Sequence, residues 1–185
     1  MIVRLAMVAL CLAAADCAVQ RPPDTARLPF AAFGTLDNDV AAANQAAWAF
    51  AVPARTANNP VDAARAAAGV DYLAGALSTN PRWLMVSPFT KQEMLQGRLE
   101  VRGALGISPA APSQVVVIAL LRFAWAWQAG DRSGALRELA APGFSLPPEQ
   151  TVQVLSNLPY IRAANIASID AANQMLPGGD TLRRS

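Results

Sequence analysis

The chain has 185 residues, of which 54% are apolar and 15% charged, and its formal net charge is +2. This length suits one domain and a leader, and the apolar content is too high for a disordered chain. The small net charge and the dispersed arginines exclude an extended nucleic-acid-binding surface. The sequence contains no histidine, so the commonest general base and metal ligand is absent.

The first residues have the layout of a secretory signal peptide. Arg4 supplies a positive charge, and an apolar run of eleven residues follows from Leu5 to Ala15. This run is too short to span a membrane, which requires about 20 residues in a helix. Residues 1–16 are therefore predicted to form a cleaved signal peptide, with a buried N-terminal helix as the alternative.

The end of this leader contains a cysteine motif. The stretch from Leu12 to Ala18 resembles the lipobox of bacterial lipoprotein precursors, a run of apolar and small residues that ends in the lipidated cysteine. It departs from the family pattern at Ala14 and Asp16. The resemblance implies lipidation of Cys17 and a membrane as partner. Ala18 after the cysteine implies the periplasmic side of the outer membrane.

A cut after Ala15 is the alternative, because Ala13-Ala14-Ala15 also forms an A-x-A cleavage site. The mature chain would then begin at Asp16 and stay in the periplasm without an anchor. The cysteine count favours lipidation. Cys11 is removed with the leader, and a single free thiol is unusual in an oxidising compartment.

The remainder is predicted to be one all-α domain. Residues 17–34 contain three prolines and no sustained periodicity, so they are expected to form a semi-extended tether. Residues 35–179 show helix signals with short breaks and no alternating strand pattern. They are predicted to form an irregular helical bundle of about six or seven helices. Residues 180–185 are expected to be a frayed tail.

The first two helices have clear start and stop signals. The first is predicted to begin with Thr35 as its N-cap and to end at Pro53. The second is predicted to begin with Asn59 as its N-cap and Pro60 in its first turn. Its apolar positions recur at helical spacing, at Ala63, Ala66, Val70, Leu73 and Leu77.

Four or five further helices follow. Residues 82–85 are predicted to form a short helical turn, and Ser87 to cap a long helix that reaches Leu105. Ser113 is predicted to cap a helix that ends at Gln128, and this helix is apolar on every side except at Arg122. An all-round apolar helix is typical of a central position, so this one is expected to be the centre of the bundle.

The last part of the domain is expected to contain three shorter helices. The first runs from Asp131 to Leu139, and the second follows the Pro147-Pro148 pair. Pro159 separates the third, which carries Ile161, Ile169 and Leu176.

Two arginines are the first candidate binding residues. Arg98 and Arg102 fall within the apolar arc of their helix, and an arginine on a buried face needs a carboxylate, a carbonyl or an anionic ligand. One interpretation is structural, either by snorkelling or by pairing with Asp71 or Asp170. The other is a pocket that binds an anion through a bidentate guanidinium.

Trp48 and Tyr72 are the second candidates, because each lies opposite the main apolar face of its helix. They are expected either to cover a second layer of helices or to contact a partner protein, whose identity the sequence does not indicate.

No combination of residues predicts catalysis, a metal site or a cofactor. The single lysine lacks a serine three residues before it, the carboxylates are scattered, and the glycines form no phosphate-binding loop. The sequence therefore favours an exported envelope protein with a non-catalytic binding or structural module. The alternative is a periplasmic protein, either a small-anion binder or an unorthodox enzyme, that uses the face with Arg98 and Arg102.

Overall fold

The computed structural model describes residues 22–35 and 37–176, and this part of the chain consists of helices and the connections between them. Two short 3-10 helices, Pro53–Arg55 and Pro81–Trp83, accompany seven α-helices. One isolated bridge, between Ile107 and Phe144, is the only β-pairing in the described ranges. The all-α prediction is confirmed. The α-helices are α1 (Asn38–Ala51), α2 (Pro60–Thr79), α3 (Pro88–Ala104), α4 (Ser113–Gln128), α5 (Arg132–Glu138), α6 (Pro148–Leu155) and α7 (Arg162–Met175).

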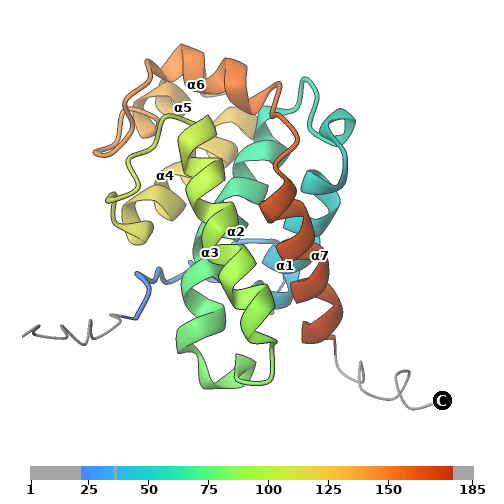
Figure 1. Ribbon diagram of the computed structural model, residues 1–185. Helices are drawn as coiled ribbons and strands as arrows, with labels where there is room; N and C mark the ends of the chain where they lie inside the picture. The colour runs from blue at the N-terminus through green and yellow to red at the C-terminus, as the bar shows by residue number, and fades with distance from the viewer. Residues whose placement is uncertain (1–21, 36, 177–185) are drawn as a thin grey trace, which may run out of the picture.

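Four of the helices form a closed ring. Helix α1 packs against α2 and α7, and α3 packs against the same two helices (Figure 1). Helix α4 lies against α2 and carries α5 beside it, while α6 contacts α2 and α5. Among the residues that the structure describes, no helix is both long and apolar enough to cross a bilayer.

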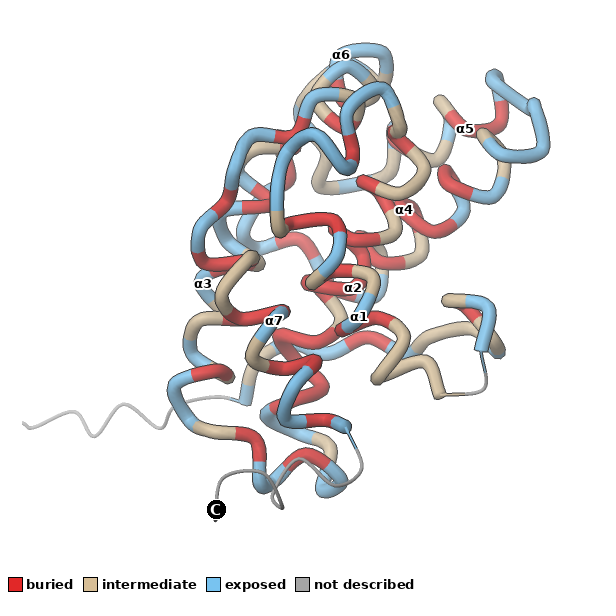
Figure 2. The backbone as a smooth tube through the Cα atoms, turned by 90° about the vertical axis from the view of Figure 1, so that its right-hand side faces the viewer, coloured by how far each residue is buried: buried red, intermediate tan, exposed pale blue. Residues whose placement is uncertain are grey.

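The central helix is α2, not α4, so the prediction for α4 is wrong. Fourteen of the 20 residues of α2 are buried, and they lie in the middle of the molecule (Figure 2). Small side chains let its neighbours approach closely: a Cβ added at Gly69 would lie 3.1 Å from the carbonyl oxygen of Ala42. In contrast, Arg122 and Trp125 of α4 are exposed.

The last helix buries mainly small side chains. Ile161, just before it, is buried, whereas Ile169 and Leu176 are exposed. Helix α7 lies so close to α3 that a Cβ added at Gly97 would be 3.0 Å from the Cα of Ala164. Only small residues fit this contact, and the buried face is accordingly rich in alanine: Ala163, Ala164, Ala167, Ser168, Ala171, Ala172 and Met175.

The predicted helix starts are confirmed for α2 and α3 and wrong for α1. The Asn59 side chain accepts a hydrogen bond from the backbone N–H of Asp62, and Ser87 accepts one from Thr90. Helix α1 is capped by Asp37, whose carboxylate accepts from the N–H of Val40. The hydroxyl of Thr35 donates to the carbonyl oxygen of Asp37, and Thr35 lies two residues before the N-cap position.

Candidate functional site

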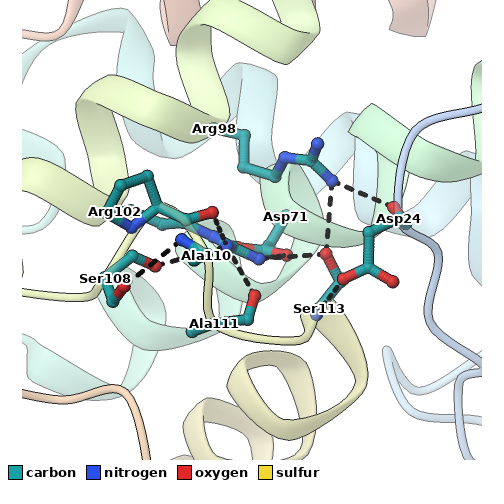
Figure 3. Close-up of polar contacts among 9 residues, drawn as sticks. Asp24, Asp71, Arg98, Arg102, Ser108, Ala110, Ala111 and Ser113 are labelled. Atoms are coloured by element: carbon teal, nitrogen blue, oxygen red, sulfur yellow. Dashed lines mark hydrogen bonds and ion pairs between the residues drawn. The ribbon is translucent and has the colours of Figure 1, made fainter. Parts of the chain in front are cut away.

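The first candidate site is a buried ion pair between α3 and α2. The side chains of Arg102 and Asp71 are each 3% exposed. The guanidinium binds the carboxylate in a bidentate manner, with Nε 2.6 Å from Oδ2 and Nη2 2.9 Å from Oδ1 (Figure 3). Two coplanar hydrogen bonds to one carboxylate are the strongest arrangement that an arginine makes.

The remaining donors of Arg102 are also used inside the protein. Nη1 donates to the carbonyl oxygens of Ala111 and Pro109, at 2.7 and 3.0 Å, and Nη2 donates to the hydroxyl of Ser113 at 2.9 Å. Each guanidinium nitrogen therefore has a protein acceptor. Arg102 pairs with Asp71, one of the two acids that the sequence indicated, and it fastens the α3–α4 connection to α2.

Arg98 lies one turn earlier on α3 and is only half buried. Its Nη1 donates to the carbonyl oxygen of Asp24 at 3.0 Å and to the hydroxyl of Ser113 at 3.2 Å. Burial is the main cause that lowers the pKa of Arg98. The negative charge of Asp71 raises this pKa, whereas the positive charge of Arg102 lowers it. Nη1 is the only nitrogen of Arg98 with a hydrogen-bond partner among the described residues.

The segment before α1 is packed onto the domain rather than separate from it. The carboxylate of Asp24 accepts a hydrogen bond from the backbone N–H of Ser113, the first residue of α4. The N-cap position of α4 is Pro112, which has no capping side chain. Asp24 therefore supplies the negative charge that a helix N-terminus favours, whereas Ser113 was predicted to be the cap.

Two more hydrogen bonds hold this segment. The backbone N–H of Arg27 donates to the side chain of Gln114, and the Gln114 amide donates to the carbonyl oxygen of Arg27. A Cβ added at Gly75 would lie 2.5 Å from the carbonyl oxygen of Asp24, so the segment touches the backbone of α2. The described part of the predicted tether, residues 22–34, is thus docked on α2 and α4.

A second polar cluster lies where α1 begins and α2 ends. Asp39 accepts hydrogen bonds from the hydroxyl of Tyr72, from Nε1 of Trp83 at 2.7 Å and from the amide of Asn80 at 3.4 Å. Burial, and then the hydrogen bond to Asp39, raise the pKa of Tyr72 above its usual value. Asp39 therefore joins α1, α2 and the α2–α3 connection.

Arg82 lies on the outer side of this cluster. It pairs with both carboxylate oxygens of Asp37, and its guanidinium carbon is 4.3 Å from the ring centroid of Trp83. The hydrogen bond from Arg82 holds the pKa of Asp37 below its usual value. Both side chains are about half exposed, so the pair is a surface feature worth about 0.2–1 kcal/mol.

Exposed apolar side chains gather beside this cluster. Leu84 is 71% exposed, Met85 92% and Phe89 61%, in the α2–α3 connection and the first turn of α3. Leu176, at the end of α7, is 49% exposed. These four residues are called the end patch below. A monomeric protein exposes single apolar residues freely, but a group of them marks a contact surface.

An open pocket of about 290 Å³ lies within this surface. Its walls come from the α2–α3 connection on one side and the end of α7 on the other. The lining residues are Arg82, Trp83, Met85, Val86, Gln174, Met175 and Leu176. Met85 and Leu176 therefore border the same hollow, which Trp83 and Arg82 of the polar cluster also line.

Trp48 and Tyr72 do not form one site. Trp48 is partly exposed, and Arg55 lies over its ring and donates a hydrogen bond to its carbonyl oxygen. Tyr72 contacts Asp39, which is nine residues before Trp48 on α1, or about 13 Å along the helix axis. Cys17 lies outside the described residues.

The end patch was missed because two of its residues, Leu84 and Met85, were interpreted only as part of a short helical turn. A signal was present: Trp83, Leu84 and Met85 are three consecutive large apolar residues in a connection between two proline-marked helix boundaries. Connections are usually polar because they lie at the surface. The role of Asp24 had no such signal, because its partner Ser113 is 89 residues away.

Within residues 22–35 and 37–176, no group of three or more acidic, cysteine or histidine side chains is arranged to hold a metal ion. No family model matches the chain, and no curated protein or solved structure is significantly similar to it.

Proposed function

We propose that this chain is an exported envelope protein, anchored through a lipid on Cys17, whose helical domain is a non-catalytic binding or structural module. The leader and the lipobox-like stretch around Cys17 support the anchor. The end patch carries the binding part of the proposal. It combines apolar side chains with 49 to 92% exposure and an adjoining pocket, which is the composition of a contact surface.

The residues around Arg102 support a structural role for this cluster, because they pair with one another inside the protein. Arg102 has protein acceptors on all three nitrogens, and Asp71 accepts two of those hydrogen bonds. A ligand would have to displace these partners and leave buried charges unpaired, which is unfavourable by several kcal/mol. The domain therefore uses its buried polar residues for folding, and an outside partner meets the end patch.

The anchor is tested by the intact mass of the protein purified from the cell envelope. The expected mass is that of a chain beginning at Cys17 with acyl groups attached. A Cys17→Ala variant is the control, and it should leave the membrane fraction. A wild-type chain that begins at Asp16 without acyl groups contradicts the anchor.

The contact surface is tested by thiol labelling in the intact envelope. Met85→Cys places a thiol in the end patch, and Glu149→Cys places one on α6, at the opposite end of the bundle (Figure 1). Both sites are exposed in the protein itself, so a maleimide should modify both equally after purification in detergent. In the envelope the Met85→Cys site should react several-fold more slowly. Equal labelling at the two sites in the envelope contradicts the proposal.

A second candidate is a small-anion site at Arg98. It is favoured by one observation: only Nη1 of this half-buried guanidinium is paired among the described residues. Titration calorimetry with inorganic phosphate tests it. Binding by the wild type that is lost in Arg98→Gln, at unchanged stability, supports an anion site. Lost stability without any phosphate binding supports a structural role for Arg98.

A further inference from the structure

We propose that the end patch rests on the leaflet that holds the lipid anchor, so that its occupant is a lipid surface. This inference depends on the proposed lipidation of Cys17, and it adds which face of the domain meets the membrane. Four observations carry it: the docking of Asp24, the short chain before it, the position of the patch and the residues around it.

The docked segment limits how far the domain can be from its anchor. The carbonyl and the carboxylate of Asp24 are held by Arg98 and Ser113. Cys17 is seven residues before Asp24, and an extended chain spans at most about 3.6 Å per residue. The lipid-bearing residue therefore lies within about 25 Å of Asp24, whatever path the chain takes.

The docking point lies in the same half of the bundle as the end patch. Asp24 and Thr25 touch α2 at Gly75, four residues before this helix ends at Thr79. Four residues correspond to about 6 Å along a helix axis, and the α2–α3 connection with Leu84 and Met85 begins just beyond. Both views show the N-terminal segment in the lower half of the molecule, with the α2–α3 connection at its foot (Figures 1 and 2).

The residues of the patch suit insertion among lipid headgroups. Leu84 and Met85 project from a short connection, and Phe89 follows in the first turn of α3. Lys91 lies beside them and donates a hydrogen bond to the carbonyl oxygen of Leu84, and Arg82, which is paired with Asp37, borders the pocket. Apolar side chains next to a cation such as Lys91 suit the interface of an anionic leaflet.

The size of the patch favours a leaflet over a protein partner. A stable protein interface needs roughly 20–30 residues on each side, whereas the end patch has four exposed apolar side chains. A few contacts are sufficient for the end patch, because the lipid anchor keeps the effective concentration of the leaflet at the patch high. The acylated cysteine then holds the protein at the membrane, and the patch determines which face of the domain meets the leaflet.

The test uses the lipidated, full-length mature protein purified from membranes and reconstituted into phosphatidylethanolamine–phosphatidylglycerol vesicles. A polarity-sensitive fluorophore is attached to Met85→Cys or, as the matched control, to Glu149→Cys. Spin-labelled lipids in the vesicles should quench the fluorophore at Met85→Cys several-fold more than the one at Glu149→Cys. Equal quenching at both positions overturns the inference.

A second pair of variants tests whether the quenching depends on the patch itself or on the polarity of any exposed leucine position. Leu84→Ser in the Met85→Cys background should reduce the quenching, whereas Leu99→Ser, at an exposed leucine further along α3, should not. Weak quenching together with a disulfide-linked dimer through Met85→Cys would show that a second copy of the chain covers the end patch. This result would overturn the proposal that the patch rests on lipid. An intact mass without acyl groups overturns the anchor as well, whereas an acylated protein with equal quenching overturns this inference alone.

Discussion

The two polar clusters of this protein have opposite relations to their surroundings. Around Arg102, every guanidinium nitrogen has a protein partner, and the ion pair with Asp71 is almost completely buried. Around Asp39, the same kind of hydrogen bonding holds Tyr72 and Trp83, but the cluster is bordered by exposed Leu84 and Met85.

The difference separates a cluster that holds distant elements together from one that, in our proposal, supports a contact surface. The Arg102 cluster fastens the α3–α4 connection and, through Ser113 and Arg98, the N-terminal segment, so it organises elements distant in sequence. The Asp39 cluster holds the α2–α3 connection through Asn80 and Trp83, and the exposed apolar side chains lie on the outer surface of this connection. A rigid support below an exposed apolar group reduces the entropy lost on binding.

The largest effect is expected for Arg102→Met, which leaves Asp71 buried without its partner. Removing one member of a buried ion pair destabilises a protein by about 3–5 kcal/mol. Urea unfolding measures this change. Arg122→Met, at an exposed position of α4, is the matched control and should change the free energy of unfolding by less than about 0.5 kcal/mol. Equal stabilities of the two variants would mean that the cluster is not essential to the fold.

The next effect concerns the docked N-terminal segment. Gly75→Ala places a methyl group against the backbone of Asp24 and Thr25, and such overpacking costs about 1–3 kcal/mol. Trypsin should then cut after Arg27 faster than in the wild type, because the hydrogen bonds of Arg27 with Gln114 are loosened.

Gly103→Ala is the control for this change. Nothing lies within 4 Å of a Cβ at Gly103, so alanine there should stabilise α3 by about 0.5–1 kcal/mol. Slow cleavage after Arg27 in both variants would show that the segment is held by contacts other than its fit against Gly75.

A smaller effect is expected for Trp83→Phe. Phenylalanine keeps most of the packing but loses the hydrogen bond from Nε1 to Asp39, so the free energy of unfolding should fall by about 1 kcal/mol. Trp125→Phe is the matched control, because Trp125 is partly exposed on α4. If the control loses as much as Trp83→Phe, the hydrogen bond to Asp39 contributes nothing specific.

The smallest effect is the pH dependence of the pair between Asp37 and Arg82. The folded pKa of Asp37 lies below its usual value of 3.8 because Arg82 donates to the carboxylate. The resulting stability is complete above the unfolded pKa and disappears as the pH falls through the folded one. Asp37→Asn keeps a capping side chain for α1, so it removes mainly the charge.

This variant should therefore be less stable than the wild type by about 0.2–1 kcal/mol near neutral pH. The difference should shrink at low pH, as the pH falls through the folded pKa of Asp37, because the protonated carboxyl group and the amide are both neutral. Urea unfolding near neutral pH and at low pH checks the sign. A difference that grows on acidification contradicts the assigned pairing.

The sequence predicted local helix signals better than helix packing. The Asn59-Pro60 start of α2 was read correctly, because capping depends on neighbouring residues. The central position of α2 was missed because its buried surface is mainly alanine and glycine, which rank low in hydrophobicity although they allow the closest approach of other helices. The apolar run of α4 instead predicted that α4 would be the central helix.

The candidate site follows the same rule: features set by neighbouring residues were predicted, and contacts between distant residues were not. The arc containing Arg98 and Arg102 was identified from helical periodicity, and Asp71 was one of two acids considered as partners. Only the packing of α3 on α2 decides between Asp71 and Asp170. The capping of α4 by Asp24 depends on a contact between residues 89 positions apart, for which one sequence contains no periodic signal.

The central claim is that the end patch serves contact and contributes nothing to the fold. The most direct test is the free energy of unfolding of the Leu84→Ser, Met85→Ser double variant, measured by equilibrium urea unfolding. Because both side chains are mostly exposed, the value should stay within about 0.5 kcal/mol of the wild type. A loss of about 2 kcal/mol or more, the size typical of a truncated core residue, would contradict the claim.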